Sequence, residues 1–287
     1  MKFLLNFLSK RTILAISLLI IYYLLVVLLH KEVSDVIVSL VKDTPRSVYQ
    51  GIVLAAGLLV LALYIFLIIR SILIREWKRS IIFYLFFTVL FVVLAFEIII
   101  IHNIEIIHFA QYAGLAILLF PIVKRFGNTV FWATIFGFFD ELYQYLVLRP
   151  DGTDYFDFND VILNQIGAGL GLVLIFSSGF YLYRLEKRKW YQSNLNIALI
   201  ILIVTVSILF LTSIIEYYPS QEDHSWKLIL VKVKEEGFWR FVNPVIGRFH
   251  IVRPLEGTVI IALLLMFYST MDRVAKSITS LQDRVNG

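Results

Sequence analysis

The chain carries eight apolar runs, each long enough to form a membrane helix, separated by shorter polar segments. A helix of about 20 apolar residues spans the hydrocarbon core of a bilayer, where every backbone group must be hydrogen-bonded within the protein. The runs cover residues 12–29, 51–70, 80–101, 106–123, 129–148, 160–183, 194–216 and 256–271. The sequence therefore predicts an all-α, polytopic transmembrane bundle of about eight helices.

Composition agrees with this class of protein. Hydrophobic residues make up 60% of the 287 residues, and there is no cysteine, whereas soluble domains are about 45–50% apolar. The net charge of +5 is modest, and excess Lys and Arg in a membrane protein usually set its orientation. We therefore expect no nucleic-acid partner, no disulfide and no thiolate metal site. The first run lacks a short apolar core followed by a cleavage site, so we interpret it as a retained helix.

Basic residues are concentrated at alternate ends of the predicted helices. They precede the first run, follow the second, fourth and sixth runs, and follow the eighth. If all eight runs cross the membrane, these positions lie on one side, which the positive-inside rule makes cytoplasmic. We therefore expect a multi-pass protein of the cell membrane with both termini in the cytoplasm. The segment 217–255 also holds six Lys and Arg residues, but long translocated loops carry little weight in this rule.

Three regions follow from this layout: N-terminal helices in 1–100, a core in 101–185, and C-terminal helices in 186–287. In the last region we expect 217–255 to form a small external cap, with a hairpin, that rests on the membrane. Four aromatic residues of this segment are expected to be interfacial anchors: Trp226, Trp239, Phe238 and Phe241. The apolar stripe of the tail, from Met271 to Val285, predicts an amphipathic helix on the inner membrane surface.

Polar residues of the core region recur at helical spacing. At about 100° per residue, His108 and Tyr112 share one face of the fourth run with Glu105. Two further faces carry polar residues together with glycines that permit close helix packing: Gly137, Glu141 and Gln144 in the fifth run, and Asp160, Asn164, Gly167 and Gly171 in the sixth. A charge at a helix centre costs roughly 2.5–3.5 kcal/mol on insertion scales. We therefore expect the three faces to meet around one cavity at the outer ends of the helices.

The motifs EIIHFAQYAGL, GFFDELYQ and RPDGTDYFDFNDVILNQIGAGLG, in this order, resemble the VanZ-like family. That family is named for a protein linked to resistance to the glycopeptide antibiotic teicoplanin. The resemblance covers about residues 100–175, and it implies a membrane protein without naming a reaction. Its pattern falls on His108, Phe109, Tyr112, Gly137, Asp140, Glu141, Gln144, Arg149, Asp157, Asp160, Asn164, Gly167 and Gly171.

Three functions fit the polar faces. In the first, the cavity binds a membrane lipid, a lipid-linked cell-wall precursor or a lipoglycopeptide antibiotic. Arg149 would then grip an anionic group or pair with a nearby carboxylate. The other expected ligand-binding residues are Tyr112, Gln144, Asp157 and Asn164, with Glu141 and Asp160 also available to bond sugar or peptide groups.

In the second function, the chain is an intramembrane enzyme that acts on such a lipid. Glu141 or Asp160 would act with His108 as base and acid. In the third, the carboxylates relay protons in a transporter, although no internal repeat is evident. A purely structural hydrogen-bonded network between helices is the competing interpretation. We expect no cofactor and no metal, because the spacing of Glu97, His102, Glu105 and His108 matches no ligand motif.

Overall fold

The computed structural model describes residues 1–28, 39, 46–74, 77–101, 103–148, 155–180, 194–218, 228–232, 237–243 and 247–286. In these residues the chain is an all-α membrane bundle, as predicted. The helices are α1 (Lys2–Ser9), α2 (Thr12–Leu28), α4 (Arg46–Leu73), α5 (Lys78–Ile98), α6 (Ile107–Val123), α7 (Phe126–Tyr143), α8 (Phe158–Ser177), α9 (Asn194–Leu211) and α10 (Pro254–Asn286). A 3₁₀ turn, η1 (Asn103–Ile106), precedes α6, and a π-helical turn, η2 (Gln144–Leu148), follows α7.

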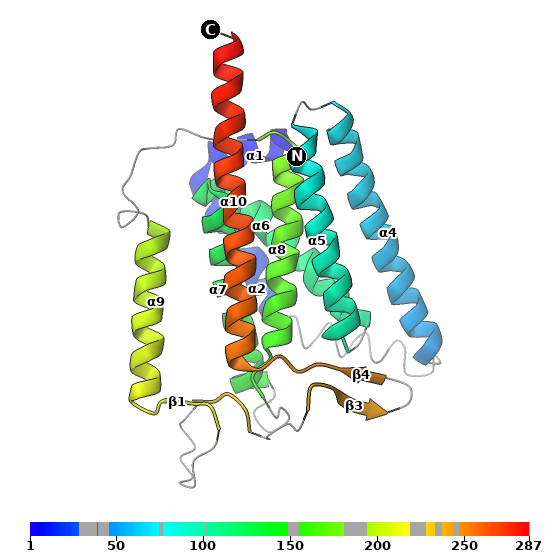
Figure 1. Ribbon diagram of the computed structural model, residues 1–287, viewed down its shortest axis with the longest axis vertical. Coiled ribbons are helices and arrows are strands. Elements are labelled where there is room, and N and C mark those ends of the chain that lie inside the picture. The colour runs from blue at the N-terminus through cyan, green and yellow to red at the C-terminus, as the bar shows by residue number, and fades with distance from the viewer. Residues whose placement is uncertain are drawn as a thin grey trace.

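Each of the eight apolar runs is helical over most of its length, although the run 194–216 ends in strand β1 (Ile215–Glu216), and these helices lie roughly along one axis (Figure 1). Five of them are long and apolar enough to cross a membrane among the described residues: α4, α5, α6 with its preceding turn, α8 and α10. A sixth span results if α1 and α2, which are bent by 111° at their junction, are taken together. The chain is thus a multi-pass membrane protein. Both termini lie at one end of the bundle, and the strands lie at the other (Figure 1).

Helix α8 is the centre of the bundle and packs against α5, α6, α7 and α10. Its glycines allow this close contact. A Cβ atom at Gly171 would lie 2.5 Å from the Ala113 carbonyl oxygen of α6, and one at Gly167 would lie 2.9 Å from the His108 carbonyl oxygen. The backbones of α6 and α8 therefore approach more closely than larger residues would allow.

The C-terminal tail corrects one expectation. Instead of a separate helix on the membrane surface, residues 271–286 continue α10, which is 33 residues long and therefore about 50 Å in length at 1.5 Å per residue. Met271 and Ala275 are fully buried, and Val274 and Ile278 are partly buried against the core, so residues 271–278 pack against the bundle. The Asp272 carboxylate accepts hydrogen bonds from the backbone N–H groups of Phe126 and Gly127, both at 2.9 Å, and thus caps α7.

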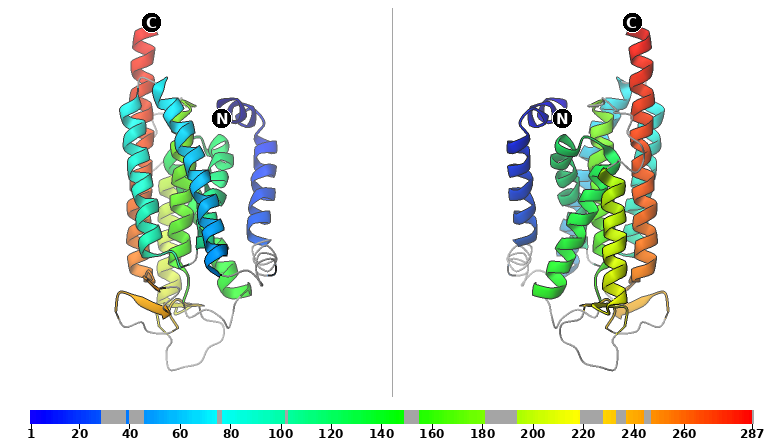
Figure 2. Two further views of the ribbon diagram at one scale, coloured as in Figure 1. Left: turned by 90° about the vertical axis from the view of Figure 1, so that its right-hand side faces the viewer. Right: turned by 90° about the vertical axis from the view of Figure 1, so that its left-hand side faces the viewer.

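The N-terminal helix α1 was not predicted as a separate element. It turns across the end of the bundle that holds the termini (Figure 2), and its Leu5 and Leu8 are buried. Eight residues are too few to reveal such a helix by periodicity alone. Their apolar face can be recognised only when the neighbouring α6, against which it packs, is in place.

The cap contains two short pairs of strands. Strands β1 (Ile215–Glu216) and β2 (Leu228–Ile229) pair in parallel. Strands β3 (Arg240–Asn243) and β4 (Gly247–Phe249) form the expected hairpin. Phe238, Trp239 and Phe241 are exposed, as interfacial anchors would be, whereas Trp226 lies outside the described residues.

The cap is fastened to α10 by His250. Its Nδ1 lies 2.6 Å from the Phe238 carbonyl oxygen, its Nε2 lies 2.9 Å from the Glu256 carboxylate, and its ring stacks on the Phe238 ring at 3.9 Å. Strand β4 and the start of α10 are thereby held in one position above the polar residues of the core.

Candidate functional site

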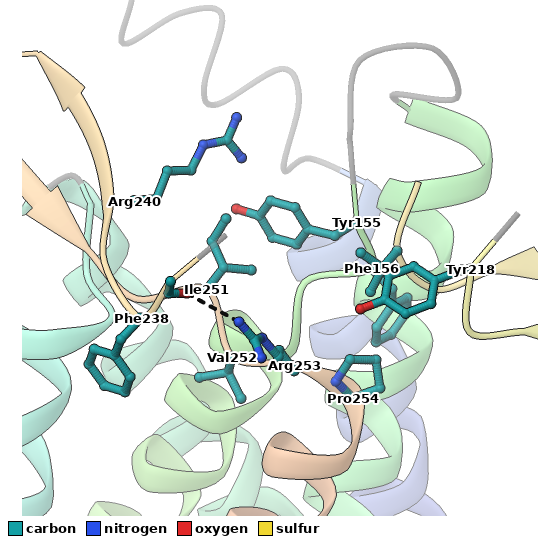
Figure 3. A pocket seen from close by; sticks show the side chains of 11 residues that line it. Tyr155, Phe156, Tyr218, Phe238, Arg240, Ile251, Val252, Arg253 and Pro254 are labelled. Atoms are coloured by element: carbon teal, nitrogen blue, oxygen red, sulfur yellow. Dashed lines mark hydrogen bonds between the residues drawn. The ribbon is translucent and has the colours of Figure 1, made fainter. Parts of the chain in front are cut away.

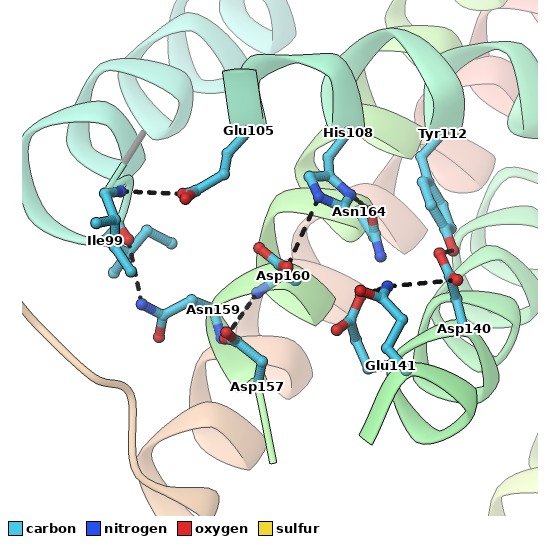
Figure 4. A network of polar contacts seen from close by, with 12 residues as sticks. Ile99, Glu105, His108, Tyr112, Asp140, Glu141, Asp157, Asn159, Asp160 and Asn164 are labelled. Atoms are coloured by element: carbon cyan, nitrogen blue, oxygen red, sulfur yellow. Dashed lines mark hydrogen bonds and ion pairs between the residues drawn. The ribbon is translucent and has the colours of Figure 1, made fainter. Parts of the chain in front are cut away.

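The cap-side ends of α6, α7 and α8 bring most of the predicted site residues together (Figure 4). Five of these side chains are at least 91% buried, and they come from three separate stretches of sequence: His108, Tyr112, Glu141, Gln144 and Asn164. Asp140 joins them with 1% of its surface exposed. We call these six residues, together with Asp157 and Asp160, the polar cluster.

His108 connects α6 to α8. Its Nδ1 lies 2.9 Å from the Asn164 side-chain oxygen, and its Nε2 lies 3.7 Å from the Asp160 carboxylate. Asp160 and Asn164 are one helical turn apart, so a single imidazole reaches both. The Asp160 side chain keeps 18% of its surface exposed, and Asp157 is also partly exposed.

At the end of α7, helical spacing of three and four residues brings one amide to two carboxylates. Gln144 donates to Glu141 at 3.1 Å and to Asp140 at 3.5 Å through the same Nε2 atom. The Tyr112 hydroxyl of α6 donates to the other Asp140 oxygen at 3.3 Å. π-helical turns inside helices occur frequently at functional sites. Here the turn begins at Gln144 itself.

Asn164 has an unused donor. Its side chain is fully buried, and its Nδ2 atom makes no hydrogen bond within the described residues. The amide faces Gly137, where a Cβ atom would lie 3.2 Å from Nδ2. An unsatisfied buried amide costs about 1–3 kcal/mol. Among the described residues the Gln165 side-chain oxygen of α8, outside the cluster, is also buried without a hydrogen bond, so Asn164 differs by its place beside the carboxyl groups.

The start of α8 is capped by Asp157. Its Oδ1 accepts hydrogen bonds from the backbone N–H groups of Asn159 at 2.9 Å and of Asp160 at 3.3 Å. Burial, followed by the neighbouring Asp160 charge, raises the pKa of Asp157 to about 7. This helix cap places a titratable carboxyl beside Asp160.

Asn159 is a structural residue that the sequence did not single out. Its side chain donates to the carbonyl oxygens of Ile99 at 3.1 Å and His250 at 2.8 Å, and it accepts from the Val252 N–H at 2.8 Å. It therefore joins α8 to the end of α5 and to the cap. A polar residue next to a helix cap is common, so no sequence signal distinguishes this one.

The remaining predicted residues have other positions. Arg149 and His102 lie outside the described residues. Glu105 accepts a hydrogen bond from the Ile101 N–H at 2.9 Å in the turn before α6, and Glu97 is exposed on α5. In the part of the chain that the structure describes, no group of three or more possible ligands could hold a metal ion.

The cluster is rich in acceptors. It contains four carboxyl groups and one imidazole, all of them described above, and it is buried apart from Asp160 and Asp157. Such a site can bind hydroxyl, amide or amine groups, which donate hydrogen bonds. No family model, curated protein or solved structure matches the chain, so the functional argument rests on this geometry.

Proposed function

We propose that the chain is a VanZ-like protein of the cell membrane whose polar cluster binds the headgroup of an envelope lipid or an amphiphilic glycopeptide antibiotic. Sugar and peptide groups of such molecules present many hydrogen-bond donors, and the carboxyl groups of the cluster accept them. Binding of this kind would connect the protein to antibiotic resistance or to maintenance of the envelope.

The observation that carries this proposal is the unsatisfied amide of Asn164 beside buried carboxyl groups. An unpaired polar atom is costly in a low-dielectric interior, and here it lies next to groups that a ligand could also contact. A ligand oxygen that accepts from Asn164 Nδ2 would remove this cost. Ligand donors would meet Glu141 and Asp160 on the same side.

Neutral substitutions test the site. Glu141→Gln and Asp160→Asn preserve shape and remove charge, so we expect them to abolish retention of the ligand while abundance and melting temperature stay near wild type. The readout is mass spectrometry of lipids that co-purify with the protein in mild detergent. Equal loss of folded protein and ligand would contradict the proposal and leave a structural network.

A matched control is available at the other end of the bundle. Asp272→Asn also neutralises a carboxylate, but this carboxylate caps α7. We expect this variant to melt at a lower temperature and to retain the same amount of ligand per folded molecule. The control therefore separates loss of charge at the cluster from loss of charge as such.

Orientation is part of the proposal, with both termini in the cytoplasm and the cluster facing outward. The chain has no cysteine, so the labelling of a single introduced cysteine measures the accessibility of that position alone. Cysteine at exposed Phe241 of the cap should react with an impermeant maleimide in intact cells, and cysteine at position 276 should react only after permeabilisation. The reverse pattern would place the cluster at the cytoplasmic side.

A second function, intramembrane catalysis, is favoured by the position of His108. The imidazole lies between the Asn164 amide and the Asp160 carboxylate, as in sites where a carboxylate orients a base. Incubation of the purified protein with a labelled lipid distinguishes the two functions. Turnover that is lost in His108→Gln supports an enzyme, and stoichiometric retention without product supports a binding protein.

A further inference from the structure

A pocket lies in the cap. It opens between the strands and the start of α10 (Figure 3), and its lining combines aromatic rings with two guanidinium groups. The residues on which the argument depends are Tyr155, Tyr218, Gly237, Arg240 and Arg253. None of them belongs to the polar cluster.

Arg253 carries the main cationic group of this pocket. Its side chain is exposed, and its Nη2 donates to the Gly237 carbonyl oxygen at 3.1 Å (Figure 3). The nearby Glu256 carboxylate is occupied by His250 and by the Arg253 backbone N–H. Within the described residues Arg253 makes no ion pair, so its positive charge is not neutralised there.

Arg240 adds a second positive charge beside a phenol. Tyr155 and Arg240 both line the pocket. Burial, followed by the Asp157 charge, raises the pKa of Tyr155, and the charge of Arg240 acts to lower it. The Arg240 side chain also has other interactions. Its contribution to the pocket is therefore a positive potential rather than an unused donor.

The pocket adjoins the polar cluster through three consecutive residues. Tyr155 and Phe156 line the pocket, and the next residue, Asp157, caps α8 and belongs to the cluster. Positive charge therefore lies in the cap, on the arginines, and the carboxyl groups lie next to it between the helices. A ligand with one anionic group and several donor groups matches this division.

We propose that the cap pocket binds the phosphate group of a lipid headgroup through Arg253, with Arg240 adding positive potential. Guanidinium groups bind phosphate with short, charge-assisted hydrogen bonds, and the Tyr218 hydroxyl provides another donor at the rim. The identity of the ligand as a lipid rests on the function proposed above. The phosphate site itself does not.

The test measures lipid adducts of the full chain by native mass spectrometry. The probes are phosphatidylglycerol and a neutral diglucosyl diacylglycerol that lacks phosphate. Because a charge-assisted hydrogen bond contributes about 1.5–3 kcal/mol, Arg253→Gln should weaken phosphatidylglycerol binding by about 10-fold or more. Binding of the glycolipid should be unchanged, and Arg253→Lys should recover part of the loss.

Arg248→Gln is the matched control. This arginine belongs to strand β4 of the cap, lies over the Trp239 ring at 4.7 Å and does not line the pocket. Equal losses in Arg248→Gln and Arg253→Gln would indicate nonspecific surface charge and would overturn the proposal. The proposal would also be overturned if Arg253→Gln lost the glycolipid to the same extent, or if it retained phosphatidylglycerol with an unchanged melting temperature.

Inorganic phosphate separates the pocket from the cluster. It should compete with phosphatidylglycerol in the wild type and in Asp160→Asn, because both keep the arginines. One outcome would separate the two proposals: Asp160→Asn retains lipid headgroups as the wild type does, and Arg253→Gln no longer binds phosphate. The phosphate site in the pocket would then be supported, and the function proposed for the cluster would be contradicted. If inorganic phosphate binds as tightly as the phospholipid, the ligand is free phosphate, and the lipid part of the proposal is overturned.

Discussion

Helices α4 and α8 show opposite relations between hydropathy and burial. The most apolar part of α4 has a mean hydropathy of 3.1, and only 6% of it is buried within the protein. The corresponding part of α8 has a mean hydropathy of 1.6, and 89% of it is buried. A soluble protein would place these two helices the other way round.

This difference between α4 and α8 follows from the lipid that surrounds the protein. Lipid tails are as apolar as leucine, so apolar side chains gain nothing by leaving them, whereas polar groups and small residues favour contact between helices. The glycines and amides of α8 therefore place it at the centre. The leucine-rich surface of α4 remains at the periphery in contact with lipid.

The largest expected effect comes from placing a charge on the peripheral helix. Leu63 of α4 is 58% exposed, and Leu63→Asp should cost roughly 2.5–3.5 kcal/mol because the carboxylate enters hydrocarbon. The measurement is the inserted fraction of the full chain in membranes. Leu73→Asp at the end of the same helix should insert nearly normally, since the charge can reach water. Equal insertion of both variants would show that α4 does not face lipid.

The next largest effect concerns the close packing of α8 against α6. Gly171→Ala places a Cβ atom 2.5 Å from the Ala113 carbonyl oxygen, so α6 and α8 must separate, with a cost of about 1–3 kcal/mol. Gly51→Ala on α4 is the matched control, because its Cβ atom would meet nothing within 4 Å. Thermal unfolding in detergent should show a lower melting temperature only for Gly171→Ala. Similar melting of both variants would contradict the close packing of α8.

Much of this arrangement could be predicted from the sequence, because it depends on local pattern. Run length identified the helices, and helical spacing placed His108, Glu141 and Asn164 on three polar faces that the structure brings together. The proposed ligand stays a prediction.

The remainder depends on tertiary contacts that no local pattern encodes. The straight continuation of α10 is supported by Asp272, which reaches a helix that begins 146 residues earlier in the sequence. The role of Asn159 depends on carbonyl groups of Ile99 and His250. The unused donor of Asn164 is visible only when all its neighbours are placed.

A smaller effect concerns charge at the first turn of α8. The pKa of Asp157, near 4 in unfolded chains, is raised to about 7 in the folded protein. Between these values the folded protein holds a proton that the unfolded chain has lost. Stability therefore falls as pH rises from about 4 to about 7 and is level above that.

Asp157→Asn should remove this dependence, because asparagine also caps helices but does not titrate. Relative to wild type, the melting temperature of the variant should rise between pH 5 and pH 8. Each kcal/mol corresponds to about 2–4 °C in a protein of this size class. Glu97→Gln, which neutralises an exposed carboxylate on α5, should follow the wild-type profile. A constant difference between Asp157→Asn and wild type at all pH values would contradict the raised pKa.

The smallest expected effect concerns the hydrogen bond that joins the two helices. The Tyr64 hydroxyl of α4 donates to the Leu170 carbonyl oxygen of α8 at 3.0 Å. That carbonyl lies within α8, so it keeps its intrahelical partner when the hydroxyl is removed. Side-chain hydrogen bonds between membrane helices contribute about 0.6 kcal/mol on average. Tyr64→Phe should therefore lower the melting temperature by about 1–2 °C, and Tyr49→Phe on the same helix, which breaks no hydrogen bond among the described residues, should not. A large loss in Tyr64→Phe would mean that polar contacts hold α4 in place, and the comparison with α8 would then fail.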